Sequence, residues 1–77
     1  MVYHLSTRIR KIREAAGLRQ SEVAYRLDIS PSAYGQIERN AHKSTIETLF
    51  KIARAMNVSL TYLIDLDEEE GAQKNKL

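Results

Sequence analysis

Residues 20–39, QSEVAYRLDISPSAYGQIER, contain two short helical patterns with almost no chain between them. In residues 20–27 the apolar side chains recur at helical spacing, which predicts a first helix with one buried face. Ser30 followed by Pro31 is a strong start signal, because serine caps a helix and proline fits its first turn. The second helix is therefore predicted over about residues 31–39. Two helices joined by so short a turn cross at a steep angle.

The demands of a tight helix crossing can be checked against individual residues. Ala24 supplies the small side chain that is needed where the two helices meet. Asp28 occupies the turn, where a residue must tolerate positive φ, and aspartate tolerates it less well than glycine. Tyr25 and Tyr34 are expected in or beside the core, with the hydroxyl group of Tyr34 at the rim. The apolar residues expected to anchor the two helices are Val23, Leu27, Ile29, Ala33, Tyr34 and Ile37.

Another helix is predicted before this pair, over about residues 6–16. Ser6 or Thr7 can cap its start, and Gly17 stands where a glycine commonly ends a helix. The apolar positions that recur at helical spacing in this segment are Leu5, Ile9, Ile12 and Ala16.

Two helices are predicted after the pair, beyond a polar connection at residues 40–43. Ser44 and Glu47 fit a capping box, which predicts the start of the longer of the two. Asn57 is expected to end that helix in a left-handed turn, and Ser59 to cap a last short one. The longer helix is expected to bury Ile46, Leu49, Phe50, Ala53 and Met56, and the last to bury Leu60, Leu63 and Ile64.

Length and composition fit one small helical domain. The 77 residues suffice for one domain but not for a TIM barrel or a doubly wound nucleotide-binding fold. No stretch alternates with period two, so the fold class is all-α, a bundle of five short helices. We expect the folded domain over residues 6–66 and an acidic, disordered C-terminal tail over residues 67–77. The absence of cysteine excludes disulfides and thiolate metal sites.

Charge is divided unevenly along the chain. Residues 1–64 contain ten Lys and Arg against five Asp and Glu, a net charge of +5. Residues 65–77 contain two Lys and five acidic residues, a net charge of −3. A basic domain suggests a polyanionic partner, with nucleic acid first. The acidic run at residues 65–70, DLDEEE, is interpreted as a solvated tail, with competition against DNA for the basic face as the alternative.

Other function classes find little support. An enzyme is not expected, because no nucleophile–base pair, glycine-rich phosphate loop or ligand cluster is present. The two histidines, His4 and His42, are far apart in the sequence, so neither a metal site nor a cofactor is predicted. No apolar run approaches the roughly 18 residues of a membrane span, and the N-terminal residues do not form a signal peptide. We therefore expect a cytoplasmic protein without a membrane partner.

Jointly, these motifs resemble the Cro/CI-type (XRE) helix-turn-helix family, which includes phage repressors and many small bacterial regulators. The resemblance covers about residues 6–64 and is carried by residues 9–13, 17–24, 29–32, 37–40 and 46–60. It implies a five-helix lambda-repressor-like DNA-binding domain, in which the second and third helices form the helix-turn-helix. The triplet Glu38-Arg39-Asn40 also resembles the restriction–modification controller proteins, a subfamily of similar length.

The resemblance implies DNA contacts on and around the third helix. Gln20 is expected to bind a phosphate at the start of the second helix, where N–H groups and the helix dipole favour an anion. Ser32 and Gln36 lie one turn apart where family members read bases, and glutamine can pair with adenine. Pro31 and Gly35 are then shape elements, with Gly35 allowing a close approach of the backbone to DNA. The full expected contact set is Arg19, Gln20, Ser21, Pro31, Ser32, Gly35, Gln36, Arg39, Asn40, His42 and Lys43.

Other matching positions imply structural roles. Arg13 and Glu38 are expected to form an ion pair between the first and third helices. Asp28 and Asn40 stand where the family has glycine, and both residue types tolerate the left-handed conformation. Arg19 replaces the usual Ser or Thr cap of the second helix, so we expect a phosphate contact there and a lost cap.

One such domain covers a single half-site, so we expect a homodimer in the major groove of a near-palindromic duplex. Tyr62 and Leu66 are expected at the dimer interface, with residues 1–5 as another candidate. The expected function is sequence-specific transcriptional regulation, as a repressor, in a bacterial or phage-derived protein associated with the nucleoid. No small-molecule ligand domain is expected. The alternatives are an antitoxin or protein-interaction module of a toxin–antitoxin pair with autoregulatory DNA binding, and a restriction–modification controller.

Overall fold

The computed structural model describes residues 4–65, which fold into five α-helices and one 3-10 helix. In chain order these are α1 (Leu5–Ala15), α2 (Gln20–Leu27), α3 (Pro31–Arg39), η1 (Ala41–Lys43), α4 (Ile46–Ala55) and α5 (Leu60–Leu63). No strand occurs in this part of the chain, which confirms the all-α class. Residues 1–3 and 66–77, including the predicted tail, lie outside the described residues.

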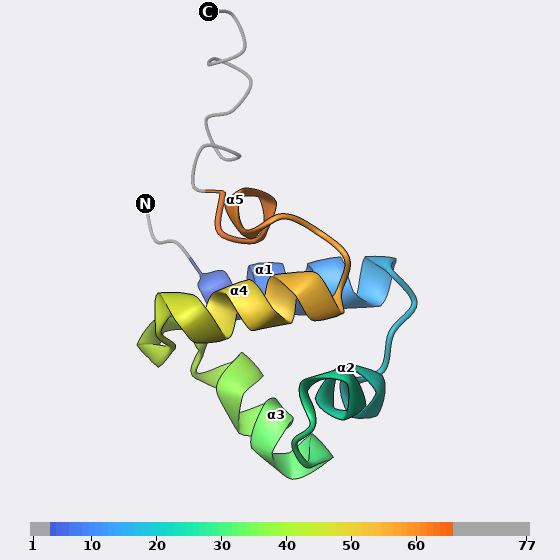
Figure 1. Cartoon of the computed structure of the whole chain (residues 1–77). Coiled ribbons are helices and arrows are strands. Elements are labelled where there is room, and N and C mark those ends of the chain that lie inside the picture. The colour runs from blue at the N-terminus through green and yellow to red at the C-terminus, as the bar shows by residue number, and fades with distance from the viewer. Residues whose placement is uncertain (1–3, 66–77) are drawn as a thin grey trace, which may run out of the picture.

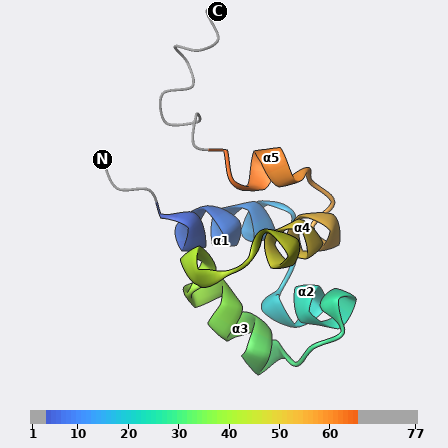
Figure 2. The same ribbon diagram turned by 60° about the vertical axis from the view of Figure 1, so that its left-hand side comes forward.

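In Figure 1, α1 lies behind α4, and both helices cross the middle of the domain. α2 and α3 lie on one side of them and α5 on the other, and the turned view in Figure 2 shows the same order. α2 packs against both α3 and α4. The helix-turn-helix pair therefore forms one end of the domain, away from the short C-terminal helix.

Residues with positive φ form three of the turns between helices. Asp28 ends α2 in the left-handed conformation, with φ 63 and ψ 42. Ser30 then caps α3, because its hydroxyl accepts the backbone N–H of Ala33 at 3.0 Å. Gly17 has φ 76 and Asn57 has φ 63, each just after a helix. These turn and cap predictions are confirmed.

All five α-helices and η1 contribute side chains to one core. Ala24 has no exposed surface, as its position at the crossing of α2 and α3 requires. Each large apolar side chain that is fully buried contributes about 1.5–3 kcal/mol relative to exposure. The buried apolar residues are Ile9, Val23, Ala24, Tyr34, Ala41, Leu49, Ile52, Ala53, Ala55, Met56 and Leu63.

Several side chains that the periodicity assigned to the core are exposed instead. On α4, Ile46 is 61% exposed and Phe50 is 46% exposed, so the prediction for these two was wrong. The buried arc of α4 is centred on Ile52 and Ala53, roughly one residue step away from the predicted arc. A helical period does not fix where the buried arc is centred, because the neighbouring helices decide that. Ala33, expected to face inward, and Tyr25, expected in or beside the core, are exposed as well.

Ser6 does not cap α1 as predicted, and neither does Thr7. The helix begins at Leu5 without a side-chain cap. The Ser6 hydroxyl instead donates to the carbonyl oxygen of Arg39 at 3.0 Å and accepts the N–H of Ala41 at 3.3 Å. Ser6 therefore ties α1 to the end of α3, where the chain enters η1.

Thr45, rather than Ser44, caps α4. Its hydroxyl accepts the backbone N–H of Thr48 at 3.1 Å. With Thr45 as the N-cap, Glu47 is the second helical residue and the predicted reciprocal capping box does not form. The negative charge of Glu47 still suits the first turn of the helix.

The short helix α5 is held against α1 by Arg8. The Nε atom of Arg8 lies 3.1 Å from the carbonyl oxygens of both Tyr62 and Leu63. Its guanidinium carbon lies 4.8 Å from the centroid of the Tyr62 ring. Ser59 caps the helix as predicted, accepting the N–H of Tyr62 at 3.0 Å, and Leu63 is fully buried.

The turn at Asp28 gives a test of backbone strain. Asp28→Gly is expected to raise the free energy of unfolding by about 1 kcal/mol, because glycine adopts positive φ without a steric cost. Asp28→Ala is expected to lower it, since alanine is poorly compatible with this conformation. Urea unfolding of both variants provides the measurement. Asp28→Asn is the control for charge, and a gain from asparagine equal to that from glycine would show that charge rather than φ sets the cost.

Candidate nucleic-acid interface

The outward side of α3 carries the residues predicted to read bases. Pro31, Ser32 and Gln36 are all exposed, and Ser32 and Gln36 lie one helical turn apart. Tyr34 and Glu38 are buried on the opposite side of the helix. α3 therefore presents a polar face outward while its inner face is anchored in the domain.

A buried carboxylate anchors that inner face. Glu38 is 4% exposed, and Arg13 of α1 approaches it with Nε 2.8 Å from Oε2 and Nη2 3.2 Å from Oε1. Gln20 of α2 donates from Nε2 to Oε1 at 2.8 Å, and the Tyr34 hydroxyl donates to Oε2 at 2.9 Å. Arg13 also donates to the carbonyl oxygen of Leu18 at 2.9 Å. The expected Arg13–Glu38 ion pair is thus present, and one carboxylate joins α1, α2 and α3.

The electrostatics of this cluster favour a charged Glu38. Burial alone would raise the pKa of Glu38, but the hydrogen bonds from its three partners outweigh burial and lower the pKa. Burial raises the pKa of Tyr34, and the neighbouring carboxylate raises it further. The hydrogen bond to Glu38 raises the pKa of Arg13. At neutral pH the cluster therefore contains one anion, one cation and a neutral phenol.

Tyr34 lies deeper than predicted. Its side chain has no exposed surface, and its hydroxyl group bonds Glu38 instead of lying at the rim of the core. A buried phenol needs a hydrogen-bond acceptor, and a carboxylate on the next turn of the same helix supplies one.

Gln20, the first residue of α2, connects the N-terminus of that helix to the Glu38 cluster. Gln20 is half-buried, while Arg19 and Ser21 on either side of it are exposed. The backbone N–H of Arg19 donates to Oε1 of Glu22 at 2.7 Å, which is one half of a capping box. The expected loss of the cap is therefore only partial. In this half of the capping box the Glu22 side chain accepts the backbone N–H of the cap residue. It therefore forms whatever side chain position 19 carries.

Gly35 is buried rather than exposed, contrary to the prediction. A Cβ atom at this position would lie 3.4 Å from Nη1 of Arg39 and 3.5 Å from Oε1 of Gln20. These two side chains cover Gly35, so its backbone is not open to a ligand in this structure. The Gln20 and Arg39 side chains thus both lie against α3 at Gly35.

The polar and basic residues after α3 are exposed. They are Arg39, Asn40, His42 and Lys43. Asn40 has φ −115 and is not in the predicted left-handed conformation. Its side chain closes the helix instead, because Nδ2 donates to the carbonyl oxygen of Gln36 at 3.0 Å. Ala41, which is fully buried, anchors η1 and leaves His42 and Lys43 at the surface.

The structure describes only part of the predicted dimer interface. Tyr62 is 50% exposed, while Leu66, its predicted partner in a dimer interface, lies outside the described residues, as do residues 1–3. Within residues 4–65, no helix has the length and apolar character needed to cross a membrane. The same residues contain no group of three or more His, Cys, Asp or Glu that could hold a metal ion.

Sequence reasoning missed two contacts that shape this region. Gln20 was expected at a phosphate, and in the structure it bonds Glu38, which lies 18 residues later in the chain. Ser6 was expected to cap α1, yet it bonds the carbonyl oxygen of Arg39, 33 residues later. Neither contact has a local sequence signal, because only the packed arrangement of helices brings the partners together.

The shared carboxylate predicts a pH-dependent effect of Tyr34→Phe. At pH 7 the variant should lose about 1.5–3 kcal/mol of unfolding free energy, because Glu38 loses a hydrogen bond to its charged form. Stabilisation from a carboxyl with a lowered pKa exists above its unfolded pKa of about 4.3 and disappears as pH falls through the folded pKa. The loss should therefore shrink toward pH 3, as measured by urea unfolding at both pH values.

Tyr25→Phe is the matched control, because it removes a hydroxyl group from a side chain that is 85% exposed. It should change the unfolding free energy by no more than about 0.5 kcal/mol at either pH. Equal losses for Tyr34→Phe at pH 7 and pH 3 would contradict a role for Glu38 as the acceptor.

Comparison with known proteins places this arrangement in a family. The helix-turn-helix family model matches residues 9–63, which includes α2, the turn and α3. The HTH-type transcriptional regulator SutR of Escherichia coli is 38% identical over 60 residues, which cover 78% of this chain and 34% of SutR. The regulator ImmR of Bacillus subtilis is 34% identical over 64 residues, covering 83% of this chain and 50% of ImmR. The regulator RamB of Mycobacterium tuberculosis is 31% identical over 65 residues, covering 84% of this chain and 14% of RamB.

The chain thus spans half or less of the length of these relatives. No solved structure matches it significantly. The family match extends from α1 into α5 and contains the complete helix-turn-helix with its Arg13–Glu38 support. The chain belongs to the Cro/CI-type (XRE) helix-turn-helix family.

Proposed function

We propose that this chain regulates transcription by binding double-stranded DNA sequence-specifically, as a dimer on a near-palindromic operator. Repression is the proposed direction, because a protein that covers a promoter needs no activity beyond DNA binding. The names of SutR, ImmR and RamB, all HTH-type transcriptional regulators, support a regulatory role. The net charge of +5 over residues 1–64 supports a polyanionic partner.

The observation that carries the proposal is the two-sided character of α3. Its outward side chains, Ser32 and Gln36, are exposed, and its inward Glu38 is bonded to α1 and α2. An α-helix fits the major groove of B-DNA, where base edges present distinct patterns of donors and acceptors. A helix held this firmly would place Gln36 reproducibly against those edges.

Cationic and polar side chains flank the proposed reading residues on both sides. Arg39 and Lys43 are exposed after them, and Arg39 forms no ion pair within residues 4–65. Arg19 and Ser21 are exposed at the start of α2. We assign these groups to phosphate contacts, which position a protein on DNA without reading its sequence.

A dimer follows from the size of the site that one α3 helix can cover. Two recognition helices on one face of B-DNA read half-sites about 34–36 Å apart. The exposed ring of Tyr62 on α5 supports a partner surface at the end of the domain opposite α3. Leu66 remains proposed for the same surface.

Selection of binding sites from a random duplex library at about 150 mM salt tests the function, because attraction to phosphate alone is reduced there. Recovery of an inverted repeat would support a dimeric sequence reader. Recovery of one unrepeated element would keep sequence reading and reject the dimer. No enrichment would reject the proposed function.

Gln36→Ala tests base reading by α3. The variant should bind the selected site more weakly by about 1–3 kcal/mol and should tolerate substitution at one base position of each half-site. Competition binding on a set of single-base variants of the site measures both effects. Thr61→Ala, an exposed polar change on α5, is the control and should leave the profile unchanged. An unchanged base preference in Gln36→Ala would contradict the proposed docking of α3.

Arg39→Ala tests the phosphate contacts. Affinity should fall by a similar factor for all sequences, and the slope of log K against log salt should become shallower by about 1 per monomer. Arg10→Ala removes the same charge from an exposed site on α1 and should leave the slope near that of the unaltered protein. Equal slopes for the two variants would place the Arg39 side chain away from the DNA.

A further inference from the structure

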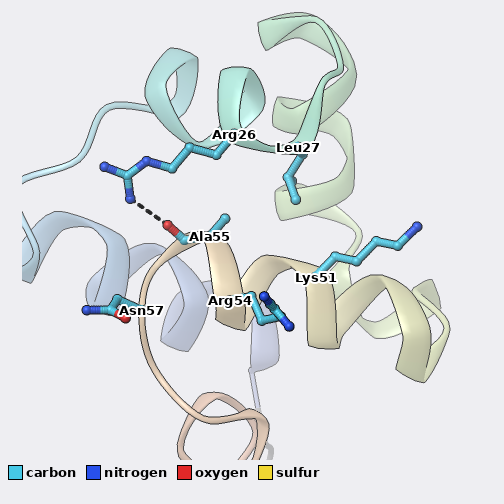
Figure 3. A pocket seen from close by; sticks show the side chains of 6 residues that line it. All are labelled: Arg26, Leu27, Lys51, Arg54, Ala55 and Asn57. Carbon is cyan, nitrogen blue, oxygen red and sulfur yellow. Dashed lines mark hydrogen bonds between the residues drawn. The ribbon is translucent and has the colours of Figure 1, made fainter.

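A basic hollow lies between the C-terminal end of α2 and α4 (Figure 3). It has a volume of about 590 Å³ and is lined by Arg26, Leu27, Lys51, Arg54, Ala55 and Asn57. Arg26 donates from Nη1 to the carbonyl oxygen of Ala55 at 2.6 Å, which fixes its guanidinium at the end of α4. Because Arg26 lies six residues after Gln20, the hollow is roughly 9 Å along α2 from the start of that helix.

Three of the lining side chains are cations and none is an acid. Lys51 pairs with Glu47 at 3.7 Å, but both side chains are largely exposed, and such surface pairs contribute little. Arg54 stacks on the ring of Phe50, with 5.8 Å from its guanidinium carbon to the ring centroid. Positive charge thus gathers in a hollow whose other lining residues are Leu27, Ala55 and Asn57, and no lining side chain neutralises it.

The chain itself carries the complementary charge. Residues 67–70, DEEE, are four consecutive acids, and only Leu66 separates them from Asp65, the last described residue. This run provides a formal charge of −4 against the +3 of the hollow. The acids and the cations therefore nearly balance.

The acidic run is also close enough to reach the hollow. Asn57 lines the hollow and precedes Asp65 by eight residues that include the four-residue helix α5. Even if the residues outside α5 were fully extended, Asn57 and Asp65 could be no more than about 22 Å apart. The turn at Asn57 makes this distance shorter. Residues 66–70 span up to about 17 Å when extended. Attraction between the charges acts over a further 10 Å or so at 0.1 M salt.

We propose that the acidic residues 67–70 dock in the α2–α4 hollow of their own chain. A tethered segment has an effective concentration in the millimolar range, which favours the site of its own chain over that of a second copy. Docking there neutralises Arg26, Lys51 and Arg54, which belong to α2 and α4 rather than to α3. The tail would thereby weaken non-specific attraction to DNA without covering the reading residues.

A spin label on the tail tests this contact in the full chain. The sequence contains no cysteine, so Ala72→Cys provides a single attachment point close to the acidic run. At 0.1 M salt, amide NMR peaks around Lys51, Arg54 and Asn57 should lose intensity through paramagnetic broadening. The broadening should fade at about 1 M salt, where the Debye length drops from about 10 Å to about 3 Å.

The double variant Lys51→Gln and Arg54→Gln should abolish the broadening, and both positions are exposed, so the fold should persist. The matched control, Arg10→Gln and Lys11→Gln on the exposed face of α1, removes the same charge and should leave the broadening intact. The broadening should also be independent of protein concentration.

Three results would overturn the proposal. Absence of broadening at the hollow would show that the tail does not dock there. Broadening along Pro31–Arg39 would show that the tail covers the reading face instead. Broadening in isotope-labelled chains without the spin label, mixed with unlabelled chains that carry it, would assign the contact to a second copy.

Discussion

The carboxylate of Glu38 is the constraint on which the rest of the domain depends. Removing a charge from water costs several kcal/mol unless nearby groups compensate. Here Arg13, Gln20 and Tyr34 compensate with four hydrogen bonds to its two oxygens. Because these partners come from three helices, the arrangement that satisfies the carboxylate also fixes the position of α3. The angle of α3 is therefore set by electrostatics as well as by apolar packing.

Because of this constraint, the two sides of α3 have different roles. Tyr34 and Glu38 hold the helix, whereas Ser32 and Gln36 make no contact on which the core depends. A substitution on the outer side can change what the helix recognises while leaving the fold intact. The same segment matches SutR, ImmR and RamB, which are proteins of very different overall length. A helix supported entirely from within its own domain is well suited to such reuse.

The sequence predicted those features that depend on neighbouring residues. The Ser30-Pro31 start, the left-handed Asp28 and the Ser59 cap all follow from local chemistry, and the structure contains each of them. The Arg13–Glu38 pair came from family resemblance, since nothing local joins residues 25 positions apart. The wrong predictions concern features that distant neighbours decide. Phe50 is exposed because of how α4 is rotated, and Gly35 is covered because the side chains of Gln20 and Arg39 lie over it.

The attachment of α5 has a consequence for how the domain opens. A helix of four residues cannot sustain itself in water, so its order depends on the packing of Leu60 and Leu63 in the core, on its contacts with α1 and α4, and on the guanidinium of Arg8. Short elements at the edge of a domain open locally, at a free energy below that of global unfolding. α5 is thus expected to open before the other helices, once the Arg8 contacts and its packing against α1 and α4 are lost. A binding event on the exposed face of α5 would therefore reach the rest of the domain through α1 and α4 alike.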